Sequence, residues 1–276
     1  ALLLAATTAT AAHAAAPTGP YVSLGDSYVA GPLIPGQVNL GCLRSDHDYP
    51  SLTAAAIGSS SLADASCSGA TTVEMTHAQL DGPITVNAPQ LNAVTGADRL
   101  VTLGIGGNDI GFVNIILTCA AESLTNPFGS PCTAHYTAGG TDQLAALINA
   151  TEPKVAAVLQ AVHQRAPQAR VVVVGYPDIL PEHNNGCWPL QPIAYGDVSY
   201  LRSTEKRLNA MLAAAAASNG AQYVDTYTPT IGHDVCQLPG TKWIEGIVPL
   251  APAAPFHPNA LGEAAMARAL EAALRS

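Results

Sequence analysis

The sequence predicts an α/β fold in which helices cover both faces of a central parallel sheet of about five strands. Short strand candidates alternate with longer helical stretches along the chain, and this alternation is typical of βαβ units and a parallel sheet. The segment from Arg170 to Val174 contains an uninterrupted run of four β-branched residues, Val171 to Val174. Such a run is typical of a strand that is buried on both faces.

Five segments are the strand candidates. The first, Tyr21 to Leu24, leads into Gly25-Asp26-Ser27, where small residues favour a sharp turn. The others are Ser61 to Ser66, Arg99 to Ile105, Arg170 to Val174 and Gln222 to Asp225. Because ligands of such sheets bind beyond the carboxyl ends of the strands, we expect the functional residues to follow these segments.

Helices are predicted between the strands. The clearest is Lys154 to Arg165, in which apolar residues recur at the i, i+3, i+4 and i+7 spacing of one helix face: Val155, Val158, Leu159 and Val162. Further helices are expected from Tyr49 to Ile57, from Asp197 to Ser218, and from Asn259 to the C-terminus, where Asn259 can act as the N-cap.

Composition and charge exclude several classes of protein. The 276 residues are 48% apolar and 11% charged, which excludes a disordered chain and favours a single compact domain over residues 17–276. The net charge is -9, with eleven Lys and Arg residues in all. Nucleic acid is therefore not an expected partner, because its binding requires clustered basic side chains. We expect a monomer.

The first residues resemble the end of a signal peptide. An apolar run over residues 1–16 contains small residues in Ala-x-Ala spacing at Ala12-His13-Ala14, as at a cleavage site. The run is too short to span a bilayer. We therefore expect a signal-peptide remnant, a secreted protein and no stable membrane anchor.

Six cysteines are present and none forms a CxxC pair, which in an exported chain favours disulfides over metal ligands. Six thiols allow fifteen pairings. The sequential pairing closes each segment without crossing another, so we predict Cys42–Cys67, Cys119–Cys132 and Cys187–Cys236.

Four features carry candidate chemistry. Ser27 lies in the turn after the first strand, where exposed backbone N–H groups favour an anion. Ser68-Gly69-Ala70-Thr71 follows the second strand, and Gly69 allows a close backbone approach to a ligand. Gly106-Gly107-Asn108-Asp109 follows the third and offers the Asn108 amide to an oxyanion. His257 precedes the last helix. Taken singly, these features also fit a turn serine, a loop, a helix cap and a structural histidine.

Together and in this order, the four features resemble the SGNH hydrolases, also called GDSL esterases and lipases. The resemblance covers essentially the whole mature chain and implies the flavodoxin-like, three-layer α/β/α sandwich of that family. It implies that Ser27 is the nucleophile and His257 the general base. It also implies that the Ser27 N–H, the Gly69 N–H and the Asn108 amide form the oxyanion hole. The implied reaction is acyl transfer from an ester to water. We expect no metal, because the sequence contains no HExxH motif and no clustered His/Asp spacing, and we expect no cofactor.

The sequence departs from the family's DxxH pattern, because Ala254 occupies the position of the Asp that usually orients the histidine. Some secreted members work with a Ser-His dyad in which a main-chain carbonyl replaces that carboxylate. We therefore predict that a backbone oxygen near Ala254 or Pro255, with Ala254 preferred, holds the Nδ1 proton of His257. A distant carboxylate, Asp225 or Asp234, is the alternative. For Asp26 we expect a structural role in holding the turn.

Apolar residues after the first and third motifs suggest a lipid or fatty-acyl ester as substrate. The predicted groove residues are Leu33, Ile34, Val38, Leu40, Ile110, Phe112, Ile115, Ile116 and Leu117, with the segment from Ile247 to Pro255 as an opposite wall. Phospholipid acyl esters and acetylated carbohydrate are alternative substrates. A secreted lipid- or carbohydrate-binding module without catalysis is the rival class of function.

Overall fold

The computed structural model of the chain describes residues 16–276. Its central sheet has five parallel strands in the order β4-β1-β7-β8-β9. The strands are β1 (Pro20–Gly25), β4 (Ser61–Asp64), β7 (Leu100–Gly104), β8 (Arg170–Val174) and β9 (Gln222–Val224). All five expected strands are present, and the predicted parallel α/β sheet is confirmed. The expected signal-peptide remnant lies, except for Ala16, outside the described residues.

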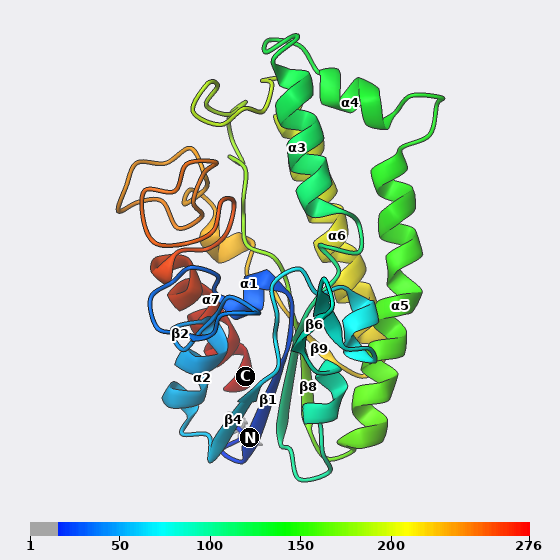
Figure 1. The fold of residues 1–276 in the computed structure, drawn as a ribbon, viewed down its shortest axis with the longest axis vertical. Helices are drawn as coiled ribbons and strands as arrows, with labels where there is room; N and C mark the ends of the chain where they lie inside the picture. Colours follow the sequence, from blue (N-terminus) through cyan, green and yellow to red (C-terminus); the bar gives the residue numbers. More distant parts are fainter. Residues whose placement is uncertain (1–15) are drawn as a thin grey trace, which may run out of the picture.

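Helices cover both faces of the sheet, which gives the predicted three-layer arrangement (Figure 1). The helices α2 (Tyr49–Ile57) and α7 (Ala260–Leu274) lie on one face, and α5 (Gln143–Arg165) and α6 (Val198–Ser218) on the other. The strand β8 shows why both faces are apolar: Val172 and Val174 pack with α7, whereas Val171 and Val173 pack with α5 and α6.

Three shorter helices complete the helical part: α1 (Ser27–Ala30), α3 (Phe112–Ser123) and α4 (Pro131–Tyr136). In Figure 1, α3, α4 and the first turns of α5 and α6 extend beyond the carboxyl edge of the sheet. Two small hairpins, β2 (Gln37–Asn39) with β3 (Arg44–Ser45) and β5 (Gln79–Asp81) with β6 (Ile84–Asn87), and three 3₁₀ turns, Thr72–Met75, Gln90–Ala93 and Thr228–Thr230, lie in the connections.

The helix predicted from Lys154 begins earlier than expected. In the structure α5 starts at Gln143, capped by the Asp142 side chain, and continues through Pro153. The buried residues Leu144, Ile148 and Thr151 extend the same apolar face that includes Val155. Tertiary packing along this face therefore holds the helix together across the proline, which by itself disfavours a helix interior. The helix α3 was not predicted as an element.

Three disulfides join Cys42 to Cys67, Cys119 to Cys132, and Cys187 to Cys236. This is the sequential pairing expected from the sequence. The first bond holds the segment before Gly69 against the loop that follows the α1 turn, and the second joins α3 to α4. Among residues 16–276, no helix is both long enough and apolar enough to cross a membrane.

Candidate active site

Ser27 is the first residue of α1, directly beyond the carboxyl end of β1. The turn is held by Asp26, whose backbone N–H donates to the Gly104 carbonyl at 3.0 Å and whose Oδ1 accepts from the Tyr28 N–H at 2.9 Å. Gly25 is required here because an added Cβ would lie 2.2 Å from Val29 Cγ2. The small residues of the motif thus permit a tight junction that leaves Ser27 at a helix N-terminus.

His257 reaches Ser27 from a loop 230 residues further along the chain. The loop is anchored by backbone bonds from Phe256 N–H to the Glu245 carbonyl at 3.0 Å and from Glu245 N–H to the His257 carbonyl at 2.9 Å. Phe256 adopts a left-handed conformation with φ of 62°. Its carbonyl accepts from the Tyr28 hydroxyl at 2.5 Å. This bond ties the histidine loop directly to the residue after the candidate nucleophile.

The Nε2 atom of His257 lies 2.7 Å from the Ser27 Oγ, and its Nδ1 lies 2.7 Å from the Pro255 carbonyl oxygen. A carbonyl can only accept, so Nδ1 must carry the proton and Nε2 is the free acceptor for the Ser27 hydroxyl. Burial lowers the pKa of His257 to about 4, although the Pro255 carbonyl opposes this change. The imidazole is therefore neutral near pH 7, as a general base must be.

The preferred orienting carbonyl at Ala254 is corrected to the neighbouring one at Pro255. The Ala254 carbonyl accepts instead from the backbone N–H of His257 at 3.1 Å, which closes a tight turn and directs that oxygen away from the ring. The alternative carboxylates bond elsewhere: Asp225 accepts from the Tyr227 and Thr228 N–H groups, and Asp234 accepts from the Cys236 N–H and the Gln237 side chain.

Gly69 and Asn108 lie in the loops after β4 and β7, the strands on either side of β1. Asn108 Nδ2 donates to the Ala70 carbonyl at 2.9 Å, which uses one of its two protons. Asp109 binds Thr72 through both oxygens, accepting from its N–H at 3.0 Å and its hydroxyl at 2.6 Å. These contacts bring the second and third motifs together. Within residues 16–276, the backbone N–H groups of Ser27 and Gly69 have no hydrogen-bond acceptor.

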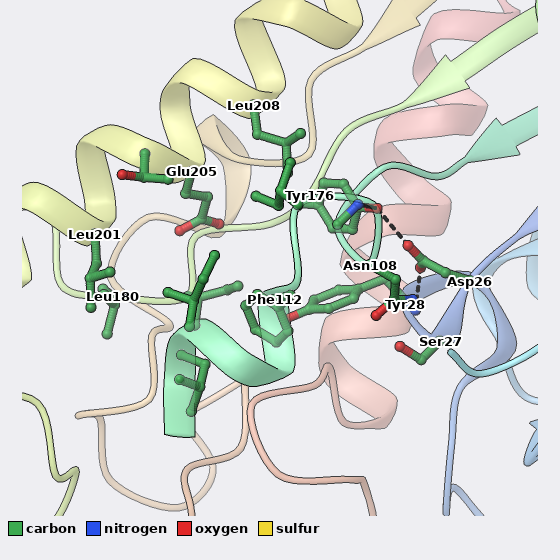
Figure 2. A pocket seen from close by; sticks show the side chains of 16 residues that line it. Asp26, Ser27, Tyr28, Asn108, Phe112, Tyr176, Leu180, Leu201, Glu205 and Leu208 are labelled. Carbon is green, nitrogen blue, oxygen red and sulfur yellow. Dashed lines mark hydrogen bonds between the residues drawn. The ribbon is translucent and has the colours of Figure 1, made fainter. Parts of the chain in front are cut away.

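Tyr176, just beyond β8, connects the nucleophile turn to the third motif. Its hydroxyl donates to Asp26 Oδ2 at 2.5 Å and accepts from the Gly107 N–H at 2.8 Å (Figure 2). Burial raises the pKa of Asp26 to about 7, while the bonds from Tyr176 and the Tyr28 N–H lower it. Asp26 therefore has hydrogen-bond partners within the scaffold rather than at His257, which agrees with the structural role expected for it.

An apolar pocket opens at Ser27 and runs between α3 and α6 (Figure 2). The space enclosed by its lining atoms, including the open mouth, is about 660 Å³. Four predicted groove residues line it: Ile110, Phe112, Ile115 and Ile116. The remaining wall comes from the segment after β8 and from α6: Ile179, Leu180, Leu201, Thr204, Glu205 and Leu208.

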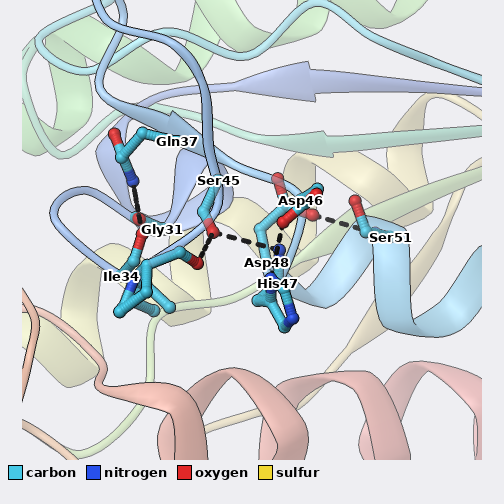
Figure 3. Close-up of polar contacts among 9 residues, drawn as sticks. Gly31, Ile34, Gln37, Ser45, Asp46, His47, Asp48 and Ser51 are labelled. Carbon is cyan, nitrogen blue, oxygen red and sulfur yellow. Dashed lines mark hydrogen bonds and ion pairs between the residues drawn. The ribbon is translucent and has the colours of Figure 1, made fainter.

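The other predicted groove residues do not line this pocket. Val38 and Leu40 are 63% and 76% exposed, and Leu33, Ile34, Leu117 and the segment 247–255 are also absent from the lining. The loop between α1 and α2 is instead held by polar contacts (Figure 3). Gln37 Nε2 donates to the Ile34 carbonyl at 2.8 Å, and the Ser45 hydroxyl donates to the Pro35 carbonyl at 3.1 Å.

Sequence reasoning missed Tyr28, Tyr176 and the α6 wall of the pocket. For Tyr176 a signal existed, because it follows the fourth strand at the edge where the other motifs converge. For α6 the signal was the spacing of Leu201, Glu205 and Leu208, which places a carboxyl group on an apolar helix face.

A parallel α/β sheet with a hydrogen-bonded serine and histidine beyond its carboxyl edge is the arrangement of a serine hydrolase. The profile of the GDSL-like Lipase/Acylhydrolase family matches residues 23–265. The chain therefore belongs to this family, and it is a carboxylic ester hydrolase.

Individual relatives agree with the family. The chain is 45% identical over 277 residues to Lipase 2 of Streptomyces coelicolor, with 96% of this chain and 90% of that protein covered. Its fold is similar to that of phospholipase A1 from Streptomyces albidoflavus, with a TM-score of 0.77, 27% identity, and coverage of 94% and 100% of the two chains. The extracellular lipase of Streptomyces rimosus gives a TM-score of 0.74 at 28% identity, with coverage of 92% and 99%.

Proposed function

We propose that this esterase works through a Ser27–His257 dyad. The single observation that carries the proposal is the 2.7 Å contact between Ser27 Oγ and a His257 Nε2 that is free to accept a proton. In the first half-reaction Ser27 Oγ attacks the ester carbonyl while His257 takes its proton. The tetrahedral intermediate then collapses, His257 returns the proton to the leaving alcohol, and an acyl-Ser27 remains. Water then attacks the acyl carbon while His257 takes its proton; the bond from that carbon to Ser27 Oγ breaks, His257 returns the proton to Oγ, and the acid is released.

The oxyanion of each tetrahedral intermediate would be held by the Ser27 N–H, the Gly69 N–H and the Asn108 side-chain amide. The first two donors make no other hydrogen bond among the described residues, and Asn108 retains a second amide proton beyond its bond to Ala70. Donors that are fixed before the reaction stabilise a developing charge without a reorganisation cost.

The Pro255 carbonyl replaces the usual carboxylate in this proposal. It selects the tautomer with the proton on Nδ1 and fixes the ring plane. Because a carbonyl carries a partial rather than a full negative charge, it stabilises the imidazolium less than an Asp would. Aromatic packing also holds the ring in place: the centroid of the Tyr28 ring lies 4.7 Å from that of His257, and the Phe112 ring meets the imidazole edge-on at 6.5 Å.

We propose lipid or fatty-acyl esters as the substrates, with the acyl chain in the apolar pocket. The support is the aliphatic and aromatic lining that begins at Ser27. Acyl esters of phospholipids are a second candidate, because the similar structure from Streptomyces albidoflavus is named a phospholipase A1.

We also propose that the protein acts outside the cell, as a monomer with one domain over residues 17–276. Its three disulfides support an oxidising compartment, and the similar Streptomyces rimosus structure is named an extracellular lipase.

The test is hydrolysis of p-nitrophenyl esters by wild type, Ser27→Ala and His257→Ala. Each variant is expected to lose about 10⁴-fold or more in kcat, and the double variant little further, because the two residues act as a unit. Ser203→Ala is the matched control: Ser203 is exposed on α6 and donates to the Ser199 carbonyl. If Ser27→Ala retained a tenth of the wild-type activity, Ser27 would be excluded as the nucleophile. A loss in Asp225→Asn or Asp234→Asn equal to that of His257→Ala would overturn the dyad.

A further inference from the structure

The far wall of the apolar pocket contains one ionisable side chain. Leu201, Thr204, Glu205 and Leu208 share one face of α6 and line the pocket opposite Phe112, Ile115 and Ile116. In Figure 2, Ser27 lies at one end of the pocket and Glu205 with Leu201 at the other, and the Glu205 carboxyl group points into the space between the helices. Of the acidic side chains that line the pocket, Asp26 has partners on both oxygens. Glu205 does not.

The Glu205 Oε1 atom is buried and has no hydrogen-bond partner among residues 16–276. Burial raises the pKa of Glu205 well above its ordinary value, and the nearby Asp178 carboxyl raises it further, against a backbone N–H of Ile179 and the Lys206 ammonium. A raised pKa favours the protonated carboxyl group, and in that form the group can both donate and accept a hydrogen bond. A buried polar atom that lacks a partner is unfavourable until a ligand supplies one.

We propose that Glu205 forms a hydrogen-bonding subsite within the apolar pocket that selects acyl chains bearing a hydroxyl group. This inference rests on the proposed function, in which the acyl chain extends from Ser27 into the pocket. A plain hydrocarbon chain would cover the carboxyl group and leave Oε1 unpaired. A hydroxyl group on the carbon of the acyl chain that lies beside Glu205, the matching carbon, would pair with Oε1. It would bring no charge into an apolar space.

The ligand class follows from the surroundings. A chain that ends in a carboxylate or an ammonium would have to desolvate an ion among Leu180, Leu201 and Leu208. The neighbouring Thr204 does not provide the same subsite, because its hydroxyl donates to the Tyr200 carbonyl at 3.0 Å within the helix. Glu205 is thus a specificity-determining residue, distant from the reacting atoms.

The experiment compares p-nitrophenyl esters of one saturated acyl chain, plain or with a single hydroxyl moved carbon by carbon along it. The quantity measured is the ratio of kcat/KM for the hydroxylated ester to that for the plain ester. At the matching carbon, the ratio for wild type is expected to exceed that for Glu205→Leu by about tenfold, the effect of one hydrogen bond in a buried site. Glu205→Gln keeps a donor and an acceptor and should retain most of the preference.

Glu152→Leu is the matched control, because Glu152 is exposed on α5 and does not line the pocket. Its ratios should equal those of wild type. Equal ratios in wild type and Glu205→Leu at every position would overturn the subsite while leaving the proposed function intact. If Glu205→Leu does not fold, the test uses the kcat/KM ratio of wild type as a function of the position of the hydroxyl group. A ratio that peaks at a single carbon supports the subsite, and a ratio that is the same at every carbon overturns it. Wild type that hydrolyses none of the esters would instead overturn the proposed function.

Discussion

The carboxyl edge of the sheet and the apolar pocket that leads away from it are built by different means. At the edge, hydrogen bonds join the short loops after β1, β4 and β7. The Asp26 N–H donates to the Gly104 carbonyl, Asn108 donates to the Ala70 carbonyl, and Asp109 accepts from Thr72. The pocket is instead the space left between two helices, α3 and α6, that pack through aliphatic side chains. The edge is therefore defined by directional polar contacts, whereas the pocket is defined by side-chain shape.

This difference predicts how substitutions in the two regions act. A change at the edge should affect every ester alike, because it alters the chemistry at the common carbonyl group. A change in the pocket should depend on the acyl chain, because it alters only the binding of groups that reach that depth.

Apart from the loss of Ser27 or His257 themselves, the largest effect is expected for Asn108→Ala. Removing one oxyanion donor should lower kcat about 10²- to 10³-fold, with little change in KM, because the donor acts on the charge that develops in the transition state. The factor should be the same for acetyl and longer acyl esters of p-nitrophenol. Asn114→Ala, on the exposed side of α3, is the control. A factor that grows with chain length would show that Asn108 binds the acyl chain rather than the oxyanion.

The pH profile should show the next largest effect. His257 must be neutral to accept the Ser27 proton, so kcat/KM should fall as the pH falls through the lowered pKa of about 4. At about pH 5 most of the imidazole would still be neutral, about 30-fold more than for an ordinary histidine with a pKa of about 6.5. The measurement is kcat/KM between about pH 3 and pH 8, with circular dichroism to follow folding. An acid limb near 6.5 would contradict the buried, carbonyl-held imidazole.

The smallest effect is expected for Leu208→Trp, which adds bulk to the pocket wall. It should lower kcat/KM about tenfold for long acyl esters, because each methylene that is excluded from an apolar site forfeits up to about 0.8 kcal/mol of transfer free energy. Acetyl esters should be hydrolysed as by wild type. Thermal unfolding would report any cost of overpacking. Equal losses on acetyl and long esters would place the effect at the carboxyl edge instead.

Much of the edge could be predicted because its signals are local. Gly25-Asp26-Ser27, Gly69, Asn108 and His257 each follow a strand or precede a helix. A parallel sheet brings the ends of its neighbouring strands to one edge whatever the length of the connections. The disulfide pairing was likewise readable from the order of the cysteines.

The orienting carbonyl was placed one residue too early for a reason that the sequence does not contain. The left-handed conformation of Phe256 turns the chain so that the Pro255 oxygen, and not that of Ala254, meets Nδ1. The Tyr28 hydroxyl, 228 residues away in the sequence, fixes this turn through the Phe256 carbonyl. A bulky residue rarely adopts such a conformation unless its surroundings impose it.

The sequence by itself determined the parallel α/β fold, the candidate serine and histidine, and the three disulfides, because these depend on periodicity, motif order and chain order. Only the tertiary structure decided which carbonyl holds His257, that Tyr176 joins Asp26 to Gly107, and that Glu205 faces the apolar pocket. The helical period of α6 shows which side chains share a face. It does not show whether that face meets a neighbouring helix closely or leaves space for a ligand, because this depends on how two distant segments pack.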